Sequence, residues 1–321
     1  MAQNALTPQE RLFMSTSINL PILVTGATGK QGGAVVAALL KAGRSVRAMT
    51  RDTQSSAAQT LGAQGVEVVK GDFNDTASLD AALVGVDGVF SMQMGSHPGD
   101  PETEVVTGRA LIEAAGRAGV RVVVHTSVAR AGDQQNFVGW DERHWEPLYW
   151  NNKAAVIEMV KAQGFPYWVI LKPALIMENL VPPMVTNMYP SLAERGQFDT
   201  AIAPDTRLDW IAAQDIGAFA AAAFADPERF NGREIELAGD TITLPDLAAK
   251  LTKATGKPVL SVSSSEEDML ARGAHPLHVR SETWNNVEGY RVDLDAVRSW
   301  GLPLTTLDEF IEQNRDKLVI G

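Results

Sequence analysis

The stretch Val24-Thr25-Gly26-Ala27-Thr28-Gly29-Lys30-Gln31-Gly32-Gly33 decides the fold of this chain. It follows the apolar run 20–24 and opens an Ala-, Val- and Leu-rich segment at 34–42, which is the order of a strand, a glycine loop and a helix. We expect Gly26 to form a tight turn, Gly29 to admit a pyrophosphate, and Gly32 to let the helix pack on the strand. A helix N-terminus attracts phosphate through its free N–H groups, so the stretch predicts a dinucleotide site. The alternative is a glycine-rich turn without a ligand.

The bulk composition narrows the class of protein. The chain has 321 residues, 45% of them hydrophobic, enough for one large domain or a large domain with a smaller lobe. Its net charge of −11 disfavours direct binding to nucleic acid. With no cysteine, disulfides, thiolate nucleophiles and cysteine-ligated metal centres are excluded. Residues 1–17 lack the apolar core of a signal peptide, and no apolar run approaches the length of a membrane span. We therefore expect a flexible N-terminal extension and a cytoplasmic protein.

Strand and helix patterns alternate from residue 20 to about residue 172. Several of the expected strands are short continuous apolar runs, which are typical of buried parallel strands. Glycines mark the expected helix ends at Gly43, Gly65, Gly119 and Gly164. The pattern predicts an α/β fold with a Rossmann-type, doubly wound parallel sheet. The expected strands are residues 21–25, 45–50, 66–70, 88–91, 121–126 and 167–172, and the expected helices are 32–42, 55–64, 78–83, 102–118 and 152–163.

The second half of the chain is less regular because prolines interrupt it. We expect helices at 215–225, 244–255, 264–272 and 306–315 and strands at 234–238 and 258–263. The last two helices begin with the capping-box patterns Ser264-x-x-Glu267 and Thr306-x-x-Glu309. We therefore divide the chain into a dinucleotide-binding domain at 18–175 and a smaller α/β substrate lobe at 176–321, some segments of which return to the Rossmann sheet.

The end of the second expected strand bears on the choice of dinucleotide. Arg51 is the first charged residue there, and a guanidinium can bind a 2′-phosphate with two hydrogen bonds. This favours NADP(H). A carboxylate at that place binds the ribose 2′-OH of NAD, so the preference reverses if Asp52 points at the ribose instead. Lys30 in the glycine loop either adds positive charge near the phosphates or is a solvated lysine on the first helical turn.

The next two strand ends are candidates for the rest of the cofactor path. Asp72 could accept a hydrogen bond from the adenine amino group with Phe73 beside the ring, or it could be a turn aspartate that caps the next helix. The fourth expected strand ends at Ser91, where the main chain would line the path to ribose and nicotinamide. The side chains there carry little information.

Candidate catalytic groups follow the fifth expected strand. Tyr149 and Lys153 are spaced i, i+4, so they share a face if the helix already includes Tyr149. A nearby ammonium lowers the pKa of a phenol, and Tyr149 could then give a proton to a carbonyl oxygen as hydride arrives at carbon. Ser127 could hold that oxygen, and Lys153 could also bind the nicotinamide ribose. Alternatively, Tyr149 is packed surface at the start of a helix.

Two further groups of residues have structural alternatives. The tryptophans Trp140, Trp145 and Trp150 form either a substrate lid or a small core. The pair His275-x-x-His278 has no glutamate between its histidines and no adjoining ligand cluster, so we interpret it as loop histidines and predict no metal site.

At this point the chain resembles the NmrA-like proteins, which are atypical members of the short-chain dehydrogenase/reductase superfamily. The residues that carry the resemblance span most of 20–260. They are the loop Gly26-Ala27-Thr28-Gly29-Lys30-Gln31-Gly32, the segment Leu171-Lys172-Pro173-Ala174-Leu175-Ile176-Met177-Glu178-Asn179, the segment Leu208-Asp209-Trp210-Ile211-Ala212-Ala213-Gln214-Asp215-Ile216-Gly217, and Phe230-Asn231-Gly232-Arg233-Glu234-Ile235-Glu236-Leu237-Ala238.

The resemblance implies a Rossmann domain with a small C-terminal lobe and a preference for NADP(H). It implies that Arg51 meets the 2′-phosphate and that Lys153 lies near the nicotinamide. Thr28, Gln31 and Pro173, which lie in the matching motifs, join the expected cofactor-binding set. Tyrosine is often missing at the position of Tyr149 in this family, so its presence favours an enzyme. The long stretch between Ser127 and Tyr149 departs from the compact classical arrangement. The catalytic role of Ser127 is therefore less well supported than that of Lys153.

Family function is divided, and two hypotheses follow. The first is an NADPH-dependent reductase of a small carbonyl, quinone or conjugated substrate. The second is an NADP(H)-sensing redox regulator that acts through protein partners without turnover. Direct DNA binding is a weaker third hypothesis, against which the acidic charge argues. The sequence predicts no membrane partner and leaves open a homodimer or a regulatory protein partner.

Overall fold

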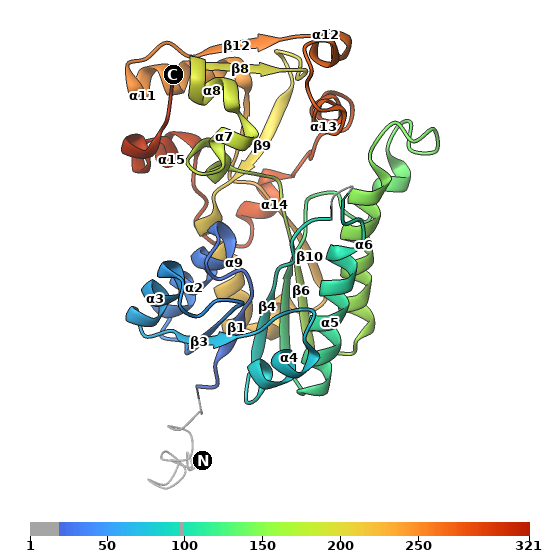
Figure 1. Ribbon diagram of the computed structural model, residues 1–321, viewed down its shortest axis with the longest axis vertical. Helices are drawn as coiled ribbons and strands as arrows, with labels where there is room; N and C mark the ends of the chain where they lie inside the picture. The colour runs from blue at the N-terminus through green and yellow to red at the C-terminus, as the bar shows by residue number, and fades with distance from the viewer. Residues whose placement is uncertain (1–18, 97–98) are drawn as a thin grey trace, which may run out of the picture.

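The structure is a computed structural model that describes residues 19–96 and 99–321. The extension predicted at 1–17 lies outside the described residues. A seven-stranded sheet with strand order β10-β6-β5-β4-β1-β2-β3 forms the centre of the larger domain (Figure 1). All of its strand pairs are parallel, which confirms the predicted Rossmann-type α/β fold. The strands are β1 (Ile22–Val24), β2 (Val46–Thr50), β3 (Glu67–Lys70), β4 (Gly88–Ser91), β5 (Val122–Thr126), β6 (Tyr167–Pro173) and β10 (Arg233–Leu237).

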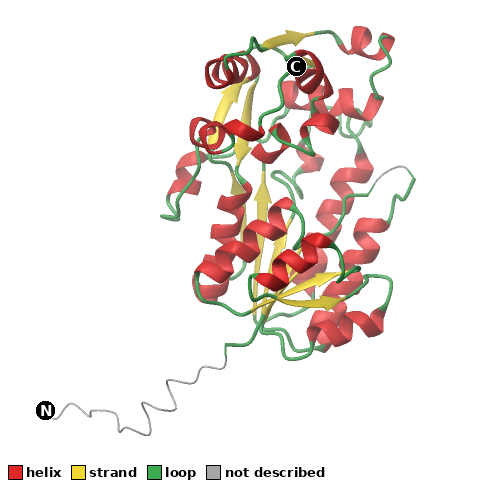
Figure 2. Ribbon diagram, turned by 60° about the vertical axis from the view of Figure 1, so that its left-hand side comes forward, coloured by secondary structure: helices red, strands yellow, loops and turns green. Residues whose placement is uncertain are grey.

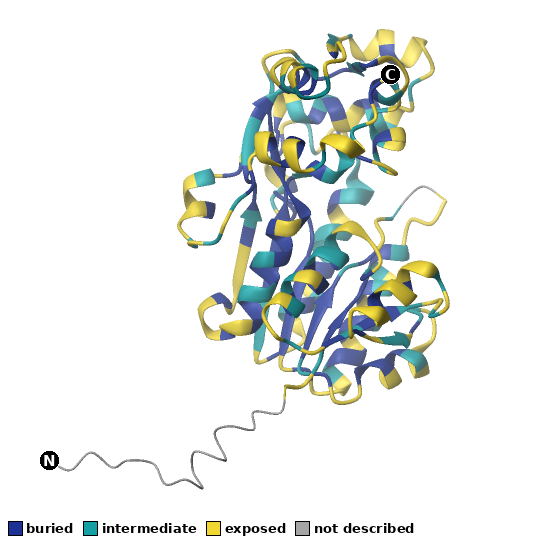
Figure 3. Ribbon diagram, turned by 90° about the vertical axis from the view of Figure 1, so that its left-hand side faces the viewer, coloured by how far each residue is buried: buried dark blue, intermediate teal, exposed yellow. Residues whose placement is uncertain are grey.

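The strands are apolar on both faces because helices cover both sides of the sheet (Figure 2). Ile22 and Val24 of β1 pack into one core, whereas Leu23 between them packs into the other. Helices α2, α3 and α9 contribute to the first core, and α4, α5 and α6 to the second. Their bounds are α2 (Lys30–Lys41), α3 (Ser56–Ala63), α4 (Thr76–Leu83), α5 (Thr103–Arg117), α6 (Pro147–Ala162) and α9 (Ala213–Ala225), with α10 (Pro227–Phe230) before β10. Coloured by burial, the strands are mostly buried and the outer helix faces exposed (Figure 3).

The small lobe has its own core and is reached directly from the carboxyl end of β6. It contains a three-stranded sheet of order β11-β9-β7 and a parallel pair of β12 and β8. Its strands are β7 (Leu175–Ile176), β8 (Gln197–Thr200), β9 (Arg207–Ile211), β11 (Asp240–Thr243) and β12 (Leu260–Ser263). Its α-helices, with α14 packing back toward β10, are α7 (Val185–Met188), α8 (Pro190–Arg195), α11 (Leu244–Thr255), α12 (Glu266–Ala271), α13 (Pro276–Val287), α14 (Leu294–Arg298) and α15 (Leu307–Gln313).

Local helix signals are confirmed with one exception. All four glycines expected at helix ends have positive φ, between 68° and 85°. Thr306 and Glu309 form the predicted capping box of α15. The box predicted at Ser264 is wrong by one residue, because Ser265 is the N-cap of α12 and its side chain accepts from the amide of Asp268.

Helix α9 packs unusually close to α2, the helix that follows the glycine loop. A Cβ placed on Gly217 would lie 2.5 Å from the carbonyl oxygen of Ala34. Glycine is therefore required at this crossing by space rather than by backbone angle. The contact fixes the position of α2, and with it the position of the loop, against the rest of the domain.

We expect Gly217→Ala to lower the free energy of unfolding by about 1–3 kcal/mol, because the added methyl overpacks the crossing of α2 and α9. Gly62→Ala is the matched control, since a Cβ on this glycine of α3 meets nothing within 4 Å. The control is expected to be neutral or stabilising by up to about 1 kcal/mol. Urea unfolding measures both, and equal stability of the two variants would contradict the close contact.

Candidate functional site

The glycine loop makes a tight turn at Gly26, as predicted. Its φ is +62°, and a Cβ there would lie 2.5 Å from Cε of Met92. The expectation for Gly32 needs correction, because this residue packs on the loop rather than on the strand. A Cβ on Gly32 would lie 2.2 Å from the carbonyl oxygen of Gly26. The loop therefore folds back on the first turn of α2.

The N-terminus of α2 is open to a ligand. The helix begins at Lys30, and its N-cap, Gly29, supplies no side-chain hydrogen bond. Its first turn carries no acidic residue. The amides of this turn have no partner within the helix, and Thr28, Gly29 and Lys30 are exposed. Such a helix end attracts an anion through its N–H groups and its dipole.

Hydrogen bonds fix the neighbouring strand ends around this loop. The hydroxyl of Thr25 accepts from the amide of Met92 at 2.8 Å and lies 3.1 Å from the carbonyl oxygen of Phe90. The hydroxyl of Thr126 donates to Oε1 of Gln31 at 2.9 Å, so Gln31 faces β5. These contacts join the ends of β1, β4 and β5, and the strand order changes direction between β1 and β4, where ligands of such sheets bind.

Lys30 reaches from the loop toward the small lobe. Its Nζ donates to the carbonyl oxygen of Pro182 at 3.2 Å, in an exposed contact. Its role at the phosphates remains a prediction. The contact places the segment at Pro182 over the same edge of the sheet as the glycine loop.

Arg51 and Asp52 differ in what their side chains bind. The carboxylate of Asp52 accepts from the amide of Gln54 at 2.8 Å and so serves the local turn. Arg51 is exposed, and within the part of the chain that the structure describes its guanidinium has no hydrogen bond or ion pair. The cation at this strand end is therefore available to a ligand, whereas the carboxylate is partly used.

Asp72 and Phe73 follow β3 in a turn. Oδ1 of Asp72 accepts from the amide of Asn74 at 2.9 Å. Asp75, not Asp72, caps α4, because its carboxylate accepts from the first amides of that helix. The alternative that Asp72 caps the helix is therefore wrong, and its second carboxylate oxygen is left for other contacts. Phe73 is half-buried against the second core.

The ends of β4 and β5 carry a buried polar network. Nδ1 of His125 lies 3.1 Å from the carbonyl oxygen and 3.2 Å from the hydroxyl of Ser91. Nε2 of Gln93 donates to the same hydroxyl at 3.0 Å. Burial, with a smaller contribution from Lys153, lowers the pKa of His125 to about 3, so the imidazole is neutral. The side chain of Ser91 therefore serves the network, and sequence reasoning missed both His125 and Gln93.

Tyr149 and Lys153 lie on one helix, since α6 begins at Pro147. Nζ of Lys153 lies 5.7 Å from the centre of the Tyr149 ring. Its ion pair is with Glu104 of α5, whose Oε1 is 2.6 Å away. The expected lowering of the pKa of Tyr149 is wrong. Burial, and secondarily the Glu104 carboxylate, raises this pKa above its ordinary value.

Ser127 lies just beyond β5, where its amide donates to the carbonyl oxygen of Leu171 at 2.8 Å. Its hydroxyl is buried and has no hydrogen-bond partner among the described residues. Oε1 of Gln93 and Oε2 of Glu104 are also buried without a hydrogen-bond partner among the described residues. Pro173, at the end of β6, accepts from the amide of Ala129 at 2.9 Å.

The tryptophans form a core rather than a lid. Trp145 and Trp150 are each 5% exposed, and Trp150 stands 4.8 Å from Trp284 of α13, centre to centre. Tyr290 lies 5.1 Å from Trp284. The aromatic cluster thus joins α6 to α13, and it brings Tyr290 toward Tyr149. Burial raises the pKa of Tyr290, with Tyr149 as a secondary cause.

The small lobe contains a cavity of about 570 Å³ between α7, α8, α12 and α13. Tyr189 lines it, and burial, with smaller contributions from Glu282 and Tyr290, raises the pKa of this phenol. His278 also lines it, at 3.3 Å from Glu282. The interpretation of both histidines as loop residues is wrong for His278, which lies in α13, whereas the side chain of His275 accepts from the amide of Leu277 as its N-cap.

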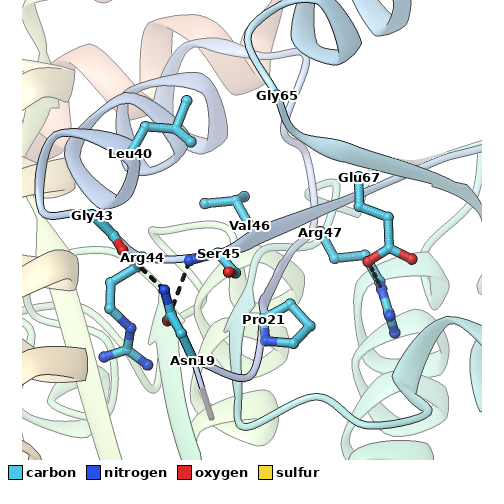
Figure 4. Close-up of a pocket in the computed structure, with 10 residues that line it drawn as sticks. All are labelled: Asn19, Pro21, Leu40, Gly43, Arg44, Ser45, Val46, Arg47, Gly65 and Glu67. Carbon is cyan, nitrogen blue, oxygen red and sulfur yellow. Dashed lines mark hydrogen bonds and ion pairs between the residues drawn. The ribbon is translucent and has the colours of Figure 1, made fainter. Parts of the chain in front are cut away.

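A second hollow lies at the opposite end of the sheet. It measures about 450 Å³ and is lined by residues around the amino ends of β1 and β2 (Figure 4). Its polar side chains bond to their neighbours. Asn19 donates to the carbonyl oxygen of Gly43 at 3.0 Å, and Arg47 pairs with Glu67 at 2.8 Å. Ligands of parallel sheets bind at the carboxyl ends, so this hollow is separate from the candidate site.

With this geometry in place, comparison with known proteins gives a definite relationship. The model of the NmrA-like family matches residues 19–311. The chain belongs to the NmrA-like family. It is similar to NAD(P)H azoreductase of Xenophilus azovorans, with 32% identity over 248 residues, 77% of this chain and 78% of that protein. Its identity to quinone oxidoreductase 2 of Escherichia coli is 32% over 256 residues, 78% of this chain and 80% of that protein.

The solved structures agree with the fold. The crystal structure of the NADPH-dependent quinone oxidoreductase of Escherichia coli in complex with NADPH superposes with a TM-score of 0.72. It is 28% identical, and the match covers 91% of this chain and 99% of that one. No helix in the described part of this NmrA-like chain is long and apolar enough to cross a membrane.

Two motifs of this NmrA-like chain that lie far apart in sequence meet at one point. Both carboxylate oxygens of Glu178 approach the amide of Ala213, at 3.1 and 3.0 Å, where α9 begins. Asp215, in the first turn of α9, accepts from the amide and hydroxyl of Thr305. The motif after β6 and the motif at the start of α9 therefore form one joint between the small lobe and the large domain.

We expect His125 and His278 to titrate at very different pH values. Since the pKa of His125 is lowered to about 3 and that of His278 is raised by its bond to Glu282, His125 is neutral at pH 6.5 and His278 takes up its proton at a much higher pH than His125. NMR titration of the imidazole protons, assigned with His125→Gln and His278→Gln, measures this. The unfolded chain protonates His125 below about pH 6.5, so its contribution to stability falls as the pH drops from there toward 3. A titration of His125 near pH 6.5 would contradict its burial.

Proposed function

We propose that this protein binds NADP(H) across the carboxyl ends of β1, β4 and β5 and uses NADPH to reduce a small quinone, azo or other conjugated substrate. The observation that carries the proposal is the glycine loop in front of the uncapped N-terminus of α2, with the unpaired Arg51 at the neighbouring strand end. Relatives 32% identical are an NAD(P)H azoreductase and a quinone oxidoreductase, which supports the same class of reaction.

The pyrophosphate would lie against the first turn of α2. The exposed loop from Thr28 to Lys30 brings backbone, without bulky side chains at Gly26 and Gly29, to the place where phosphate oxygens need N–H donors. Lys30 would add a cation by exchanging its bond to Pro182 for a phosphate oxygen. The 2′-phosphate would meet Arg51, because Asp52 is already held by its own turn.

The nicotinamide half would lie over the ends of β4 and β5. A bound cofactor needs hydrogen-bond partners there, and the unpartnered Oε1 of Gln93 and hydroxyl of Ser127 fit its amide and hydroxyl groups. Ser91 and Pro173 would shape this end through the main chain. Lys153, across from them on α6, would supply a charged donor. When bound, NADPH supplies the hydride.

The protein groups around the transfer point would handle the substrate and its proton. Tyr149 keeps its proton at working pH because its pKa is raised, so it would donate a hydrogen bond to the developing oxyanion and not act as a phenolate. A water held by Lys153 is the second candidate for the proton. The substrate would enter between α6 and the small lobe, where Tyr149 and Tyr290 are neighbours.

The choice between the dinucleotides is tested at Arg51. We expect Arg51→Ala to weaken the binding of NADPH by about 10–100-fold, because it removes a charge-assisted pair with the 2′-phosphate, and to change that of NADH less than about 3-fold. Asp52→Asn is the control and is expected to change both little. Fluorescence titration of the bound nicotinamide measures the dissociation constants. Equal losses for NADPH and NADH would show that Arg51 does not read the 2′-phosphate.

Turnover is tested by following NADPH at 340 nm with a panel of quinones, azo dyes and small carbonyls. We expect consumption with at least one conjugated substrate and loss of most of it in Lys153→Met, because the charged donor at the transfer point is gone. Lys250→Met, which removes a lysine paired with Asp308 in the small lobe, is the control. Tight NADPH binding without consumption across the panel would support instead a sensor that acts through protein partners.

A further inference from the structure

We propose that Glu104 is a cofactor-binding residue: one carboxylate oxygen holds the Lys153 ammonium, and the other accepts a hydrogen bond from a ribose hydroxyl on the nicotinamide side. This rests on the proposed function, since it requires that NADP(H) bind over β4 and β5. It assigns a role to a residue that no sequence motif marked.

The first half of the proposal is the ion pair itself. Oε1 of Glu104 lies 2.6 Å from Nζ of Lys153, and the two side chains are 3% and 13% exposed. Burial of two charges is costly unless they are paired and hydrogen-bonded, so removing either partner leaves the other strongly disfavoured. The pair therefore fixes Nζ of Lys153 in one place rather than leaving it to sample rotamers on the helix surface.

The second half is the other oxygen of the same carboxylate. Oε2 of Glu104 is buried and has no hydrogen-bond partner in the part of the chain that the structure describes. An ionised carboxylate oxygen is an acceptor only, so a group that satisfies it must be a donor. Hydroxyl groups of a sugar are donors of the right kind, whereas phosphate and a quinone oxygen are acceptors and are repelled.

The segment around Glu104 is tied to α6 by further bonds. The amide of Glu104 donates to the hydroxyl of Ser96 at 3.1 Å. Nδ2 of Asn152, next to Lys153, donates to the same hydroxyl at 3.0 Å and to the carbonyl oxygen of Pro101 at 2.7 Å. The start of α5 is therefore positioned by α6 independently of the ion pair, and a substitution at Glu104 retains this support.

The location of the pair agrees with the nicotinamide end of the site. Lys153 contributes to the lowered pKa of His125 at the end of β5, and Glu104 to the raised pKa of Tyr149. The ion pair is therefore close enough to the end of β5 and to the phenol of Tyr149 to act on both groups. It also explains why Lys153 does not acidify Tyr149, because the ammonium is neutralised by a closer partner.

The test measures binding rather than turnover. We expect Glu104→Gln and Lys153→Met each to weaken NADPH by about 10-fold or more, and the double variant to bind about as weakly as the weaker single variant, because the two residues act as one unit. Adenosine 2′,5′-bisphosphate, which lacks the nicotinamide ribose, is expected to bind all three variants as it binds the natural protein. Glu158→Gln removes a carboxylate of α6 that pairs with Lys161 and is the matched control.

Each result has a distinct meaning. If the natural protein binds NADPH and Glu104→Gln binds it equally well, or if the two single effects multiply in the double variant, the proposal is overturned. Loss of the bisphosphate together with NADPH would show a structural role only and overturn it as well. If a single variant does not fold, the double variant, which leaves no unpaired charge, decides. Weaker binding of NADPH with unchanged binding of the bisphosphate supports the proposal, and unchanged binding of both overturns it. A natural protein that binds no NADPH overturns the proposed function itself.

Discussion

The carbonyl oxygen of Gly26 is the point on which the site depends. It receives the amide of Gly29 at 2.9 Å and lies where any side chain on Gly32 would have to go. The loop can close on the first turn of α2 because residue 32 has no side chain, and a Cβ on Gly29 would also be tight, at 3.2 Å from the same oxygen. A second close backbone approach occurs where Gly217 of α9 meets Ala34 of α2. Helix α2 is thus held by close backbone contacts at its first turn and at its crossing with α9.

A second constraint operates at the ends of β4 and β5, where charge rather than space sets the geometry. The neutral His125 and the pair of Glu104 and Lys153 are buried beside one another, and their charges balance without the protonation of the imidazole. Tyr149 lies next to this group and keeps its proton. The Tyr-x-x-x-Lys spacing therefore places both side chains on one helix face, as expected. It does not lower the pKa of Tyr149, because the Glu104 carboxylate of α5 pairs with Lys153.

The sequence predicted the parts that depend on local chemistry. Apolar runs marked the strands of the large sheet, and glycines marked helix ends, where the backbone has positive φ.

The prediction failed where the structure depends on partners that are distant in the sequence. Strand β9 is defined by its pairing with β11 and β7, and α13 packs through Trp284 on an aromatic cluster from α6. In the sequence, Glu104 is an ordinary acidic residue in the first turn of a helix. Its partner Lys153 lies 49 residues away, so neither the ion pair nor the burial can be predicted from the local pattern. The Ser264 box failed by one residue because two adjacent serines offer the same cap.

Several contacts between the two lobes are polar. Lys30 bonds to Pro182 at the glycine loop, Glu178 caps α9, and Arg130 pairs with Glu288 at 3.2 Å on the side of β5 and β6. Arg130 also binds Asp133, so its guanidinium joins a turn of the large domain to the end of α13. Apolar packing joins the lobes as well. Val292 and Val297 are buried in the first core of the large domain. Trp284 of α13 lies against Trp150, whose ring is 5.2 Å from that of Tyr149, centre to centre. Tyr149 therefore packs against the same aromatic cluster that joins α6 to α13, so the packing of α13 bears directly on the position of this phenol.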